Sequence, residues 1–234
     1  MLIFAAGLGT RLRPITDTRP KALVPVAGRP LLHHVILRLK AAGFERIVVN
    51  IHHFGQQIID DLQANNHFGL DIRISDERDL LLETGGGLRH AAPLFEADSP
   101  ILIHNVDILS DADLDSLYVP QADAALLVSP RQSSRLLHFN PQSLRLEGWQ
   151  NMKTGEVRGH VTSFARAFSG IHLFSPRLFP LMQSWPERFS IIDFYLSICA
   201  EHSVCAVDQP RLRLMDVGKL DTLADADAFA DALA

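Results

Sequence analysis

Short apolar runs rich in isoleucine and valine alternate along the chain with longer segments of helical period, and this alternation constrains the fold most strongly. It predicts crossover units, in which helices pack against a mostly parallel sheet. The expected fold class is therefore α/β. In the first half of the chain the expected strands are Leu2 to Ala5, Arg46 to Ile51, Asp71 to Ser75 and Ile101 to His104.

Helices are expected between these strands. The segment LLHHVILRLKAAGF, residues 31–44, carries apolar residues on one helical face and stops near Gly43, which is typical of a helix with a C-terminal glycine. A second helix fits FGQQIIDDLQ, and a third fits ETGGGLRHAAPLF, with its start near Gly86. Glycines at the start of a helix favour contact between the backbone and a ligand.

The second half of the chain is less regular. Its strands can extend the sheet in mixed orientation. No repeat or linker divides the sequence, so we expect a single domain over residues 1–234 with an internal division near residue 110. The expected strands are Ala124 to Val128, Leu136 to Phe139, Ser143 to Glu147, Phe168 to Phe174 and Val204 to Val207. The expected helices are Pro176 to Gln183, Ile191 to Glu201 and a terminal helix from Lys219 onward.

The composition argues against several classes of partner. The formal net charge is -5, so the chain offers no broad attraction to nucleic acid or to an anionic membrane. No apolar run approaches the roughly 18 residues of a membrane span, and MLIFAAG lacks the basic start of a secretory signal, so we expect a cytoplasmic protein. Cys199 and Cys205 are expected to be reduced. The oligomeric state, and whether the native chain starts earlier, stay open at this point.

The stretch FAAGLGTRLRP, residues 4–14, places Gly7 and Gly9 just after the first strand. Backbone amides near glycine can approach a ligand closely because no side chain intervenes, and successive amides can hold phosphate oxygens. The spacing fits neither the dinucleotide fingerprint, since Leu12 stands where a third glycine is required, nor the P-loop. By itself the glycine pair is as compatible with a tight turn as with a phosphate-binding loop.

Basic residues follow the glycines closely, namely Arg11, Arg13, Arg19 and Lys21. In an acidic protein such a cluster is either a solvated loop or an anion site. The segment AGLGTRLRP followed by PKALVPVAGRPLL resembles the double motif of sugar-1-phosphate nucleotidyltransferases. The resemblance extends over essentially the whole chain.

This resemblance implies a reaction in which a nucleoside triphosphate and a sugar 1-phosphate give an NDP-sugar and pyrophosphate. The implied fold is the nucleotide-diphospho-sugar transferase fold, a three-layer Rossmann-like sandwich with a mixed, mainly parallel sheet. Residues 1–110 would form the mainly nucleotide-binding half and residues 111–234 the mainly sugar-binding half. Such chemistry needs positioning and charge stabilisation more than covalent catalysis, because charge spreads over several phosphate oxygens.

The resemblance also implies roles for the glycine loop and the basic residues. The loop backbone would cradle the triphosphate, Arg11 would neutralise the leaving pyrophosphate, and Lys21 would steady phosphate charge around the reacting phosphorus. The nucleotide-binding residues implied at this loop are Ala5, Ala6, Gly7, Gly9 and Thr10.

A divalent metal requires hard oxygen ligands, and two aspartates match the metal-ligand segments of the family. Asp107 follows the apolar run ILIHNV, at a strand end where sheets of this class open their ligand crevice. Its triplet reads NVD instead of the family's DGD or NGD. Asp216 precedes a glycine in RLRLMDVGKLDTL, which resembles the family's late DxG segment. Each aspartate alone is compatible with a capping role, but together they predict a Mg2+ site.

Recognition of the base is implied for LLETGGGLRHAA, which resembles the base-binding loop of the same family. Backbone amides near Gly86 and Gly87 would meet the edge of the base, and Glu83 or Thr84 would add contacts. A glycine-rich helix entry is the alternative interpretation. The ETGGG form favours small single-domain enzymes that uridylylate N-acetylmuramate 1-phosphate, so UTP is the favoured triphosphate.

The sugar site is less sharply encoded. FSGIHLF resembles the family's substrate strand and contains Gly170, and Asp193 lies near it at a later helix entry. Larger relatives hold the sugar phosphate with an EKP segment, whereas the sequence at Glu147 reads EGWQNMK, with a tryptophan where the lysine would stand. The expected substitutes for that lysine are Lys153 and Arg166.

Two histidine pairs lack the spacing of a metal site. His33 and His34 lie on a predicted helix and are expected to be packing or surface groups. His52 and His53 lie at a strand end, where they either pack or line the crevice.

Three alternatives to uridylyl transfer are compatible with the sequence. Two are enzymes, namely a guanylyltransferase for mannose or heptose 1-phosphate and a phosphocholine cytidylyltransferase. The third is a regulatory homologue that senses an NDP-sugar without catalysis. Such a homologue can lose Lys21, Asp107 or Asp216 and keep its fold, and all three residues are present here, so the sequence favours an enzyme.

Overall fold

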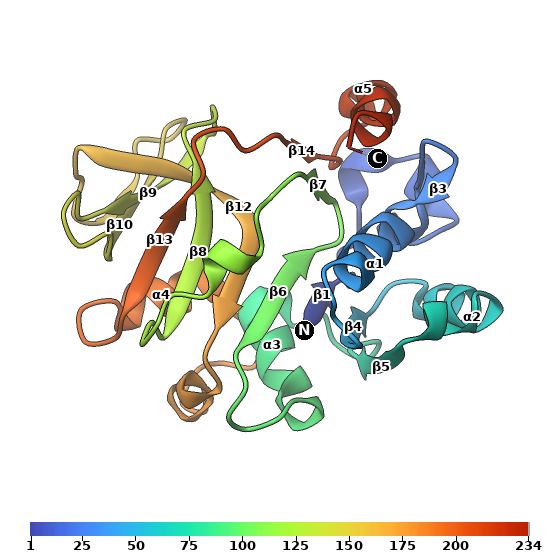
Figure 1. The fold of residues 1–234 in the computed structure, drawn as a ribbon, viewed down its shortest axis with the longest axis horizontal. Helices are drawn as coiled ribbons and strands as arrows, with labels where there is room; N and C mark the ends of the chain where they lie inside the picture. The colour runs from blue at the N-terminus through green and yellow to red at the C-terminus, as the bar shows by residue number, and fades with distance from the viewer. Residues whose placement is uncertain (234) are drawn as a thin grey trace.

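The computed structural model describes residues 1–233. One mixed sheet of ten strands crosses the molecule, and eight of its strands lie in the order β11-β10-β9-β12-β6-β1-β4-β5 (Figure 1). β8 pairs with β12, and β13 pairs with β8. The strands are β1 (Leu2–Phe4), β4 (Arg46–Ile51), β5 (Asp71–Asp76), β6 (Ile101–Asn105), β8 (Ala124–Ser129), β9 (Arg135–Phe139), β10 (Leu146–Asn151), β11 (Val157–Gly159), β12 (Phe164–Phe174) and β13 (Val204–Asp208).

The N-terminal half of the sheet is parallel, as the crossover pattern predicts. β1 pairs parallel with β4 and β6, and β4 pairs parallel with β5. Ile3 and Val49 face one buried cluster with α1 and α2, whereas Leu2 and Val48 face a second cluster with α3. Helices therefore cover both faces of the sheet, which confirms the expected α/β class. The connecting helices are α1 (Leu31–Ala41), α2 (Gly55–Ala64) and α3 (Glu83–Ala91).

Beyond β6 the pairings are antiparallel, except that β13 pairs parallel with β8. β12 pairs antiparallel with β6, β8 and β9, so this one strand joins the two halves of the sheet. The remaining helices are α4 (Ile191–Ile198) and α5 (Leu220–Asp231), and two short ribbons are formed by β2 (Pro25–Val26) with β3 (Arg29–Pro30) and by β7 (Ile108–Ser110) with β14 (Leu214–Asp216). Short 3-10 helices are Thr10–Leu12, Ile15–Asp17, Lys21–Leu23, Asn66–Gly69, Ala92–Leu94, Asp115–Leu117 and Pro176–Met182.

The C-terminal helix returns to the start of the chain. α5 lies beside the β2–β3 ribbon in Figure 1, and Ala226 of α5 shares a buried cluster with Leu12 and Val24. The same cluster includes Val217, which directly follows β14. This packing brings the late β14 segment next to the loops that follow β1. Among residues 1–233, no helix is long and apolar enough to cross a bilayer.

The third helix begins earlier than the sequence predicted. α3 starts at Glu83, so Gly85, Gly86 and Gly87 lie inside it and not at its entry. Packing explains why glycine is tolerated there, because a β-carbon at Gly85 would lie 2.3 Å from the ring of Phe189. Tertiary contact thus outweighs the low helix propensity of glycine.

Two elements of the second half also differ from prediction. The strand expected at residues 143–147 begins only at Leu146, because the Asn140 side chain accepts hydrogen bonds from two following amides and closes a turn. The helix expected at residues 176–183 is a 3-10 helix with Pro180 inside it. Proline has no amide hydrogen to donate, so it disfavours a continuous α-helix.

β12 joins the two halves of the sheet. Shortening a buried side chain of this strand should therefore lower the free energy of unfolding strongly. Phe174, at the end of β12, is 0% exposed. Phe174→Ala should lower the free energy of unfolding by about 3–5 kcal/mol, while Val157→Ala, on the exposed edge strand β11, should change it by less than about 0.5 kcal/mol. Urea denaturation followed by circular dichroism measures both variants. Equal effects of the two substitutions would contradict this account of the core.

Candidate active site

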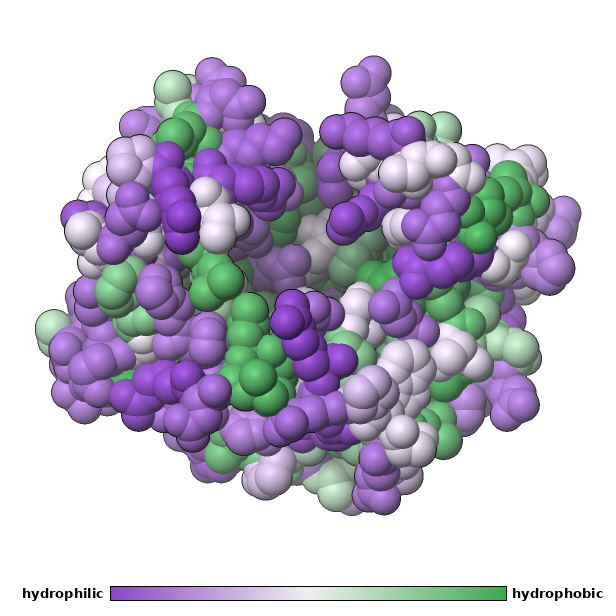
Figure 2. Space-filling view, turned by 180° about the vertical axis from the view of Figure 1, so that it is seen from behind, coloured by the Kyte–Doolittle hydropathy of each residue, from purple (hydrophilic) through white to green (hydrophobic). Residues whose placement is uncertain are grey.

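A cavity of about 590 Å³ opens at the carboxyl ends of β1, β4 and β6. Seen from behind, the molecule is hollowed between its two halves, and much of the surface around the hollow is hydrophilic (Figure 2). Strand carboxyl ends are the usual place for a ligand in an open α/β sheet. The predicted site residues that line the cavity are Ala5, Ala6, Gly7, Lys21, Glu83, Thr84 and Asp107.

Asn50, near the end of β4, holds the start of the glycine loop. Its Oδ1 accepts hydrogen bonds from the amides of Ala5, at 2.6 Å, and Ala6, at 3.2 Å, and its Nδ2 donates to Glu77 Oε1 at 2.8 Å. These bonds satisfy a side chain that is 2% exposed and would otherwise be costly to bury. The amides of Ala5 and Ala6 are therefore engaged, and nucleotide contacts predicted at these two residues would use other atoms.

The next part of the glycine loop is held by protein contacts at Gly9, whereas Gly7 has free space around it. In the described chain, the amides of residues 7–10 donate to no protein acceptor. Gly9 has φ +63°, and its carbonyl accepts a hydrogen bond of 2.8 Å from Thr16 Oγ1. A β-carbon at Gly9 would lie 2.9 Å from Thr16 Cγ2, whereas one at Gly7 would meet nothing within 4 Å. Successive free amides on a fixed loop are suited to binding an anion.

Lys21 and Asp107 form an ion pair in the wall of the cavity. Lys21 begins a 3-10 helix, and Asp107 lies in the turn between β6 and β7. Lys21 Nζ donates to Asp107 Oδ2, and the two side chains are 10% and 18% exposed. The Val217 amide also donates to the Asp107 carbonyl at 2.8 Å, which ties the late β14 segment to this turn. A cation and a carboxylate from distant parts of the chain thus meet at one point.

β14 brings Asp216 beside this pair, because it pairs antiparallel with β7, which directly follows Asp107. Partial withdrawal from water and the Asp107 carboxylate raise the pKa of Asp216, while Lys21, Arg11 and Arg131 oppose that rise. The two carboxylates supply hard oxygen ligands, and a divalent cation would relieve their mutual repulsion. The residues present therefore fit a Mg2+ ion.

Arg11 reaches Asp216 from the glycine loop. A β-carbon at Gly218 would lie 2.5 Å from Asp216 Oδ1 and 2.7 Å from Arg11 Nη2, so only glycine leaves room for both side chains. Arg131, which the sequence reasoning missed, donates from Nη2 to the Phe168 carbonyl at 2.7 Å. The signal for Arg131 was a charged residue two positions after the end of the apolar strand β8. Two arginines therefore contribute positive charge near the carboxylate pair.

Glu83 and Thr84 line the cavity at the start of α3. Glu83 forms an ion pair with Arg188, whose Nη2 lies 2.8 Å from Glu83 Oε1. Thr84 Oγ1 accepts a hydrogen bond of 2.9 Å from the Ile191 amide. Both side chains thus tie α3 to the segment that leads into α4 and shape this wall of the cavity.

Gly86 and Gly87 do not line the cavity, and their close contacts are with protein. The Gly86 amide donates to the Phe189 carbonyl at 3.3 Å, and a β-carbon at Gly86 would lie 2.4 Å from the Glu187 carbonyl oxygen. A β-carbon at Gly87 would lie 2.6 Å from Glu77 Oε1. Burial of the Glu77 carboxyl group raises its pKa. The base contacts predicted for both glycines remain predictions.

Gly170 lies against the cavity from β12. Its φ is +78°, and a β-carbon there would lie 2.6 Å from Nδ2 of Asn105, which lines the cavity. The pairing of β12 with β8 is irregular between Phe168 and His172, around this glycine. Gly170 therefore lets β12 pass close to the end of β6.

Glu147 and Asp193 are engaged elsewhere. Glu147 Oε1 accepts a hydrogen bond of 3.0 Å from Asn140 Nδ2, across the β9–β10 connection. Asp193 Oδ1 accepts a hydrogen bond of 2.6 Å from Arg158 Nη1 on β11. Neither residue lines the cavity, so their predicted contact with the sugar would need a change in these side chains.

The two expected substitutes for the missing lysine also lie outside the cavity. Lys153 is exposed in the turn between β10 and β11. Arg166 donates to both carboxylate oxygens of Asp208, at 3.0 and 3.1 Å. Besides Lys21, the basic side chain that lines the cavity is Arg135, at the start of β9, which the sequence reasoning missed.

The histidine pairs do not enter the cavity. His33 and His34 each bond within the protein, to a carboxylate and to a backbone carbonyl respectively. His52 Nδ1 lies 2.7 Å from the Glu77 carbonyl oxygen, and His53 is exposed. All four are explained by packing or surface roles, in line with the simpler of the two interpretations.

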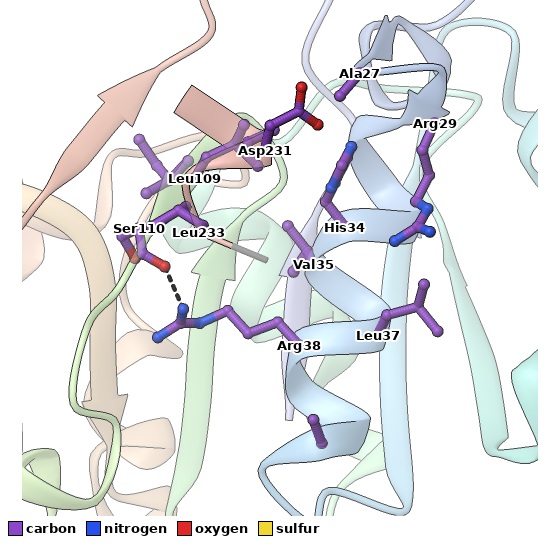
Figure 3. A pocket seen from close by; sticks show the side chains of 13 residues that line it. Ala27, Arg29, His34, Val35, Leu37, Arg38, Leu109, Ser110, Asp231 and Leu233 are labelled. Carbon is purple, nitrogen blue, oxygen red and sulfur yellow. Dashed lines mark hydrogen bonds between the residues drawn. The ribbon is translucent and has the colours of Figure 1, made fainter. Parts of the chain in front are cut away.

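A second cavity, of about 380 Å³, lies apart from this site, between α1, β7 and α5. Arg38 of α1 extends across it and donates to the carbonyl of Ser110 (Figure 3). It also donates to the carbonyl of Ala112. Burial lowers the pKa of Arg38, which remains a cation. None of the predicted site residues lines this second cavity.

Comparison with known proteins identifies the class. Residues 1–127 match the Nucleotidyl transferase family, and the chain belongs to this family of enzymes. It is 34% identical over 239 residues to N-acetylmuramate alpha-1-phosphate uridylyltransferase of Caulobacter vibrioides, with 97% of this chain and 95% of the relative covered. It is 36% identical over 179 residues to the protein of the same name from Neisseria meningitidis serogroup B, with 76% of each covered.

Solved structures share the fold at low identity. A putative glucose-1-phosphate thymidylyltransferase from Bacillus anthracis matches with a TM-score of 0.81 and 19% identity, over 98% of this chain and 94% of that one. The inositol-1-phosphate CTP transferase from T. maritima matches with a TM-score of 0.81 and 17% identity, over 99% and 94%. These matches confirm the predicted nucleotidyltransferase fold.

The loop geometry predicts different effects of substitution at its two glycines on the free energy of unfolding. Gly9→Ala should lower the free energy of unfolding by about 1–2 kcal/mol, because a left-handed φ is unfavourable for alanine and its β-carbon would crowd Thr16. Gly7→Ala is the matched control and should change that free energy by less than about 0.5 kcal/mol. Thermal denaturation of both variants is the measurement. A Gly7→Ala variant as unstable as Gly9→Ala would show that the loop is not anchored as described.

Proposed function

We propose that this enzyme transfers a uridylyl group from UTP to N-acetylmuramate 1-phosphate, or to a hexose 1-phosphate of similar shape. The products are a UDP-sugar and pyrophosphate. Two relatives that carry this name support the proposal, at 34% and 36% identity. A mannose-1-phosphate guanylyltransferase of Mycobacterium tuberculosis is also 34% identical, but the match covers only 50% of this chain and 32% of that protein. The fuller coverage favours uridylyl transfer.

The observation that carries the proposal is the meeting of three chain segments at one end of the sheet. The free amides of residues 7–10, the Lys21–Asp107 pair and Asp216 come together there. Phosphate oxygens require donors and positive charge, and a divalent metal requires carboxylates. This combination suits the triphosphate of UTP better than it suits an uncharged ligand.

We propose that the chain works as one domain. The nucleotide would lie over β1, β4 and β5, in the half formed by residues 1–110, and the sugar would lie toward β12 and β9, in the half formed by residues 111–234. We further infer that the enzyme acts in the cytoplasm, where UTP is available.

Asp107 and Asp216 would hold a Mg2+ ion, which supplies neutralisation of phosphate charge when bound. Groups of the chain itself supply the other interactions with the phosphates. The amides of residues 7–10 hold triphosphate oxygens, and Arg11, beside Asp216, balances charge that develops on the departing pyrophosphate. Lys21 fixes Asp107 and adds positive charge at the reacting phosphorus.

The reaction needs no protein nucleophile. An oxygen of the sugar 1-phosphate forms a bond to the α-phosphorus of UTP, and the bond from that phosphorus to the oxygen bridging the β-phosphorus breaks. The electron pair leaves with that oxygen as pyrophosphate. The attacking oxygen is already anionic near neutral pH, so no general base has to take a proton, and catalysis depends on positioning and charge.

A substrate panel tests the proposed reaction directly. Purified protein with Mg2+ is incubated with each of UTP, GTP, CTP and dTTP, alone and with N-acetylmuramate, N-acetylglucosamine, mannose or glucose 1-phosphate. We expect pyrophosphate release that requires both a sugar 1-phosphate and a nucleotide and is fastest with UTP and N-acetylmuramate 1-phosphate. Faster turnover with GTP and mannose 1-phosphate would establish the guanylyltransferase alternative, and no release in any mixture would remove the proposed activity.

Asp216→Asn should separate stability from activity. A folded-state pKa above the ordinary value means that folding disfavours the charged carboxylate at neutral pH, so an uncharged amide should keep or raise the stability of the metal-free protein. The same variant should lose pyrophosphate release by at least about 100-fold. It should also lose the rise in melting temperature that Mg2+ with UTP gives the wild type. An active Asp216→Asn enzyme would remove Asp216 from the metal site.

A further inference from the structure

We propose that Arg135 forms a carboxylate-binding subsite at the sugar end of the cavity, and that this subsite selects sugar 1-phosphates that carry a second, carboxylate charge. The inference rests on the proposed function and adds to it a determinant of sugar choice. It follows from the position of Arg135, from the partners of the other charged groups in the cavity, and from the chemistry of the acid sugar.

The order of strands places Arg135 away from the nucleotide side. Asn50 and Glu77 line the cavity from β4 and the end of β5, Asp107 follows β6, and Arg135 begins β9. In the sheet order, β12 alone separates β6 from β9. Two strand spacings amount to roughly 10 Å, a span comparable with the length of a phosphorylated hexose. A sugar whose phosphate lies near Asp107 would therefore extend toward Arg135.

Arg135 is also the charged group of the cavity that has no partner. Asp107 is paired with Lys21, and Glu83 is paired with Arg188. The Arg135 side chain, by contrast, makes no hydrogen bond or ion pair with any residue of the described range 1–233. An uncompensated guanidinium in a ligand cavity can receive an anion without first breaking a bond within the protein.

The backbone at Arg135 is fixed although its side chain is free. Arg135 pairs with Asn151 of β10, and the Met152 amide donates to the Ser134 carbonyl at 2.8 Å. The nearby Arg131 is anchored differently, because its Nη2 is bound to the Phe168 carbonyl and its charge acts on Asp216. Arg131 thus acts on Asp216 and does not line the cavity, which leaves Arg135 for the far end of the sugar.

The chemistry of the acid sugar matches this position. N-acetylmuramate 1-phosphate is N-acetylglucosamine 1-phosphate with a lactyl ether, so the two differ by one carboxylate-bearing group. A guanidinium binds a carboxylate through two parallel N–H donors, which gives direction as well as charge. A lysine at the same place keeps the charge but loses the paired donors.

The test compares these two sugar phosphates in wild-type enzyme and in Arg135→Ala, Arg135→Lys and Arg211→Ala. Arg211 is an exposed arginine between β13 and β14, outside the cavity, and serves as the matched control. The quantity measured is the ratio of kcat/KM for N-acetylmuramate 1-phosphate to kcat/KM for N-acetylglucosamine 1-phosphate, with UTP and Mg2+ in excess. This ratio cancels losses that are common to both substrates, including any loss of folded enzyme.

We expect Arg135→Ala to lower the ratio by roughly 10- to 100-fold, as loss of a charge-assisted contact predicts. Arg135→Lys should restore part of it, and Arg211→Ala should leave it within about twofold of the wild-type ratio. An unchanged ratio in Arg135→Ala, or a wild-type enzyme that does not prefer the acid sugar, would overturn the subsite while the transferase activity stands. A wild-type enzyme inactive on both sugars would instead remove the proposed function, and the subsite with it.

Discussion

The partly buried contact between Lys21 and Asp107 is the interaction on which the site depends. Partial withdrawal of both charges from water is costly, and their attraction offsets that cost because they form a direct ion pair. Lys21 follows the glycine loop and Asp107 follows β6, so the pair fixes the loop against the end of the sheet. The Val217 amide, bound to the carbonyl of Asp107, then adds the β14 segment that carries Asp216.

The order of the strands in the sheet gives the site around this ion pair two different ends. Parallel strands on one side of β6 supply the glycine loop and Asn50, and antiparallel strands on the other side supply Gly170 and Arg135. β12 connects the two sides, and its irregular stretch at Gly170 lets it approach Asn105. The proposed division between nucleotide and sugar therefore follows the change from parallel to antiparallel pairing.

Strands and helices of the first half were predictable because apolar periodicity is a local property of the sequence. Asn50 was not singled out, although a lone polar residue inside the apolar run RIVVNI is a signal for a buried hydrogen-bonding role. The start of α3 was misplaced because the contact of Gly85 with Phe189 joins residues far apart in the chain.

The sugar side of the site was harder to predict for a related reason. Glu147 and Asp193 were chosen by resemblance, but their carboxylates bond to Asn140 and Arg158, which the sequence does not place beside them. Arg135 begins a strand whose register with β12 only the folded chain defines. By contrast, the aspartates of the predicted Mg2+ site carried motifs that could be recognised without the fold.

Crystals grown with MnCl2 and UTP, without sugar phosphate, give the most direct measurement of the central claim. Manganese replaces magnesium at hard oxygen ligands and scatters anomalously, so its position is read from an anomalous difference map. The account predicts a manganese peak in contact with both Asp107 and Asp216 and triphosphate oxygens on the amides of residues 7–10. A manganese peak away from these two carboxylates, or a triphosphate bound elsewhere, would contradict it.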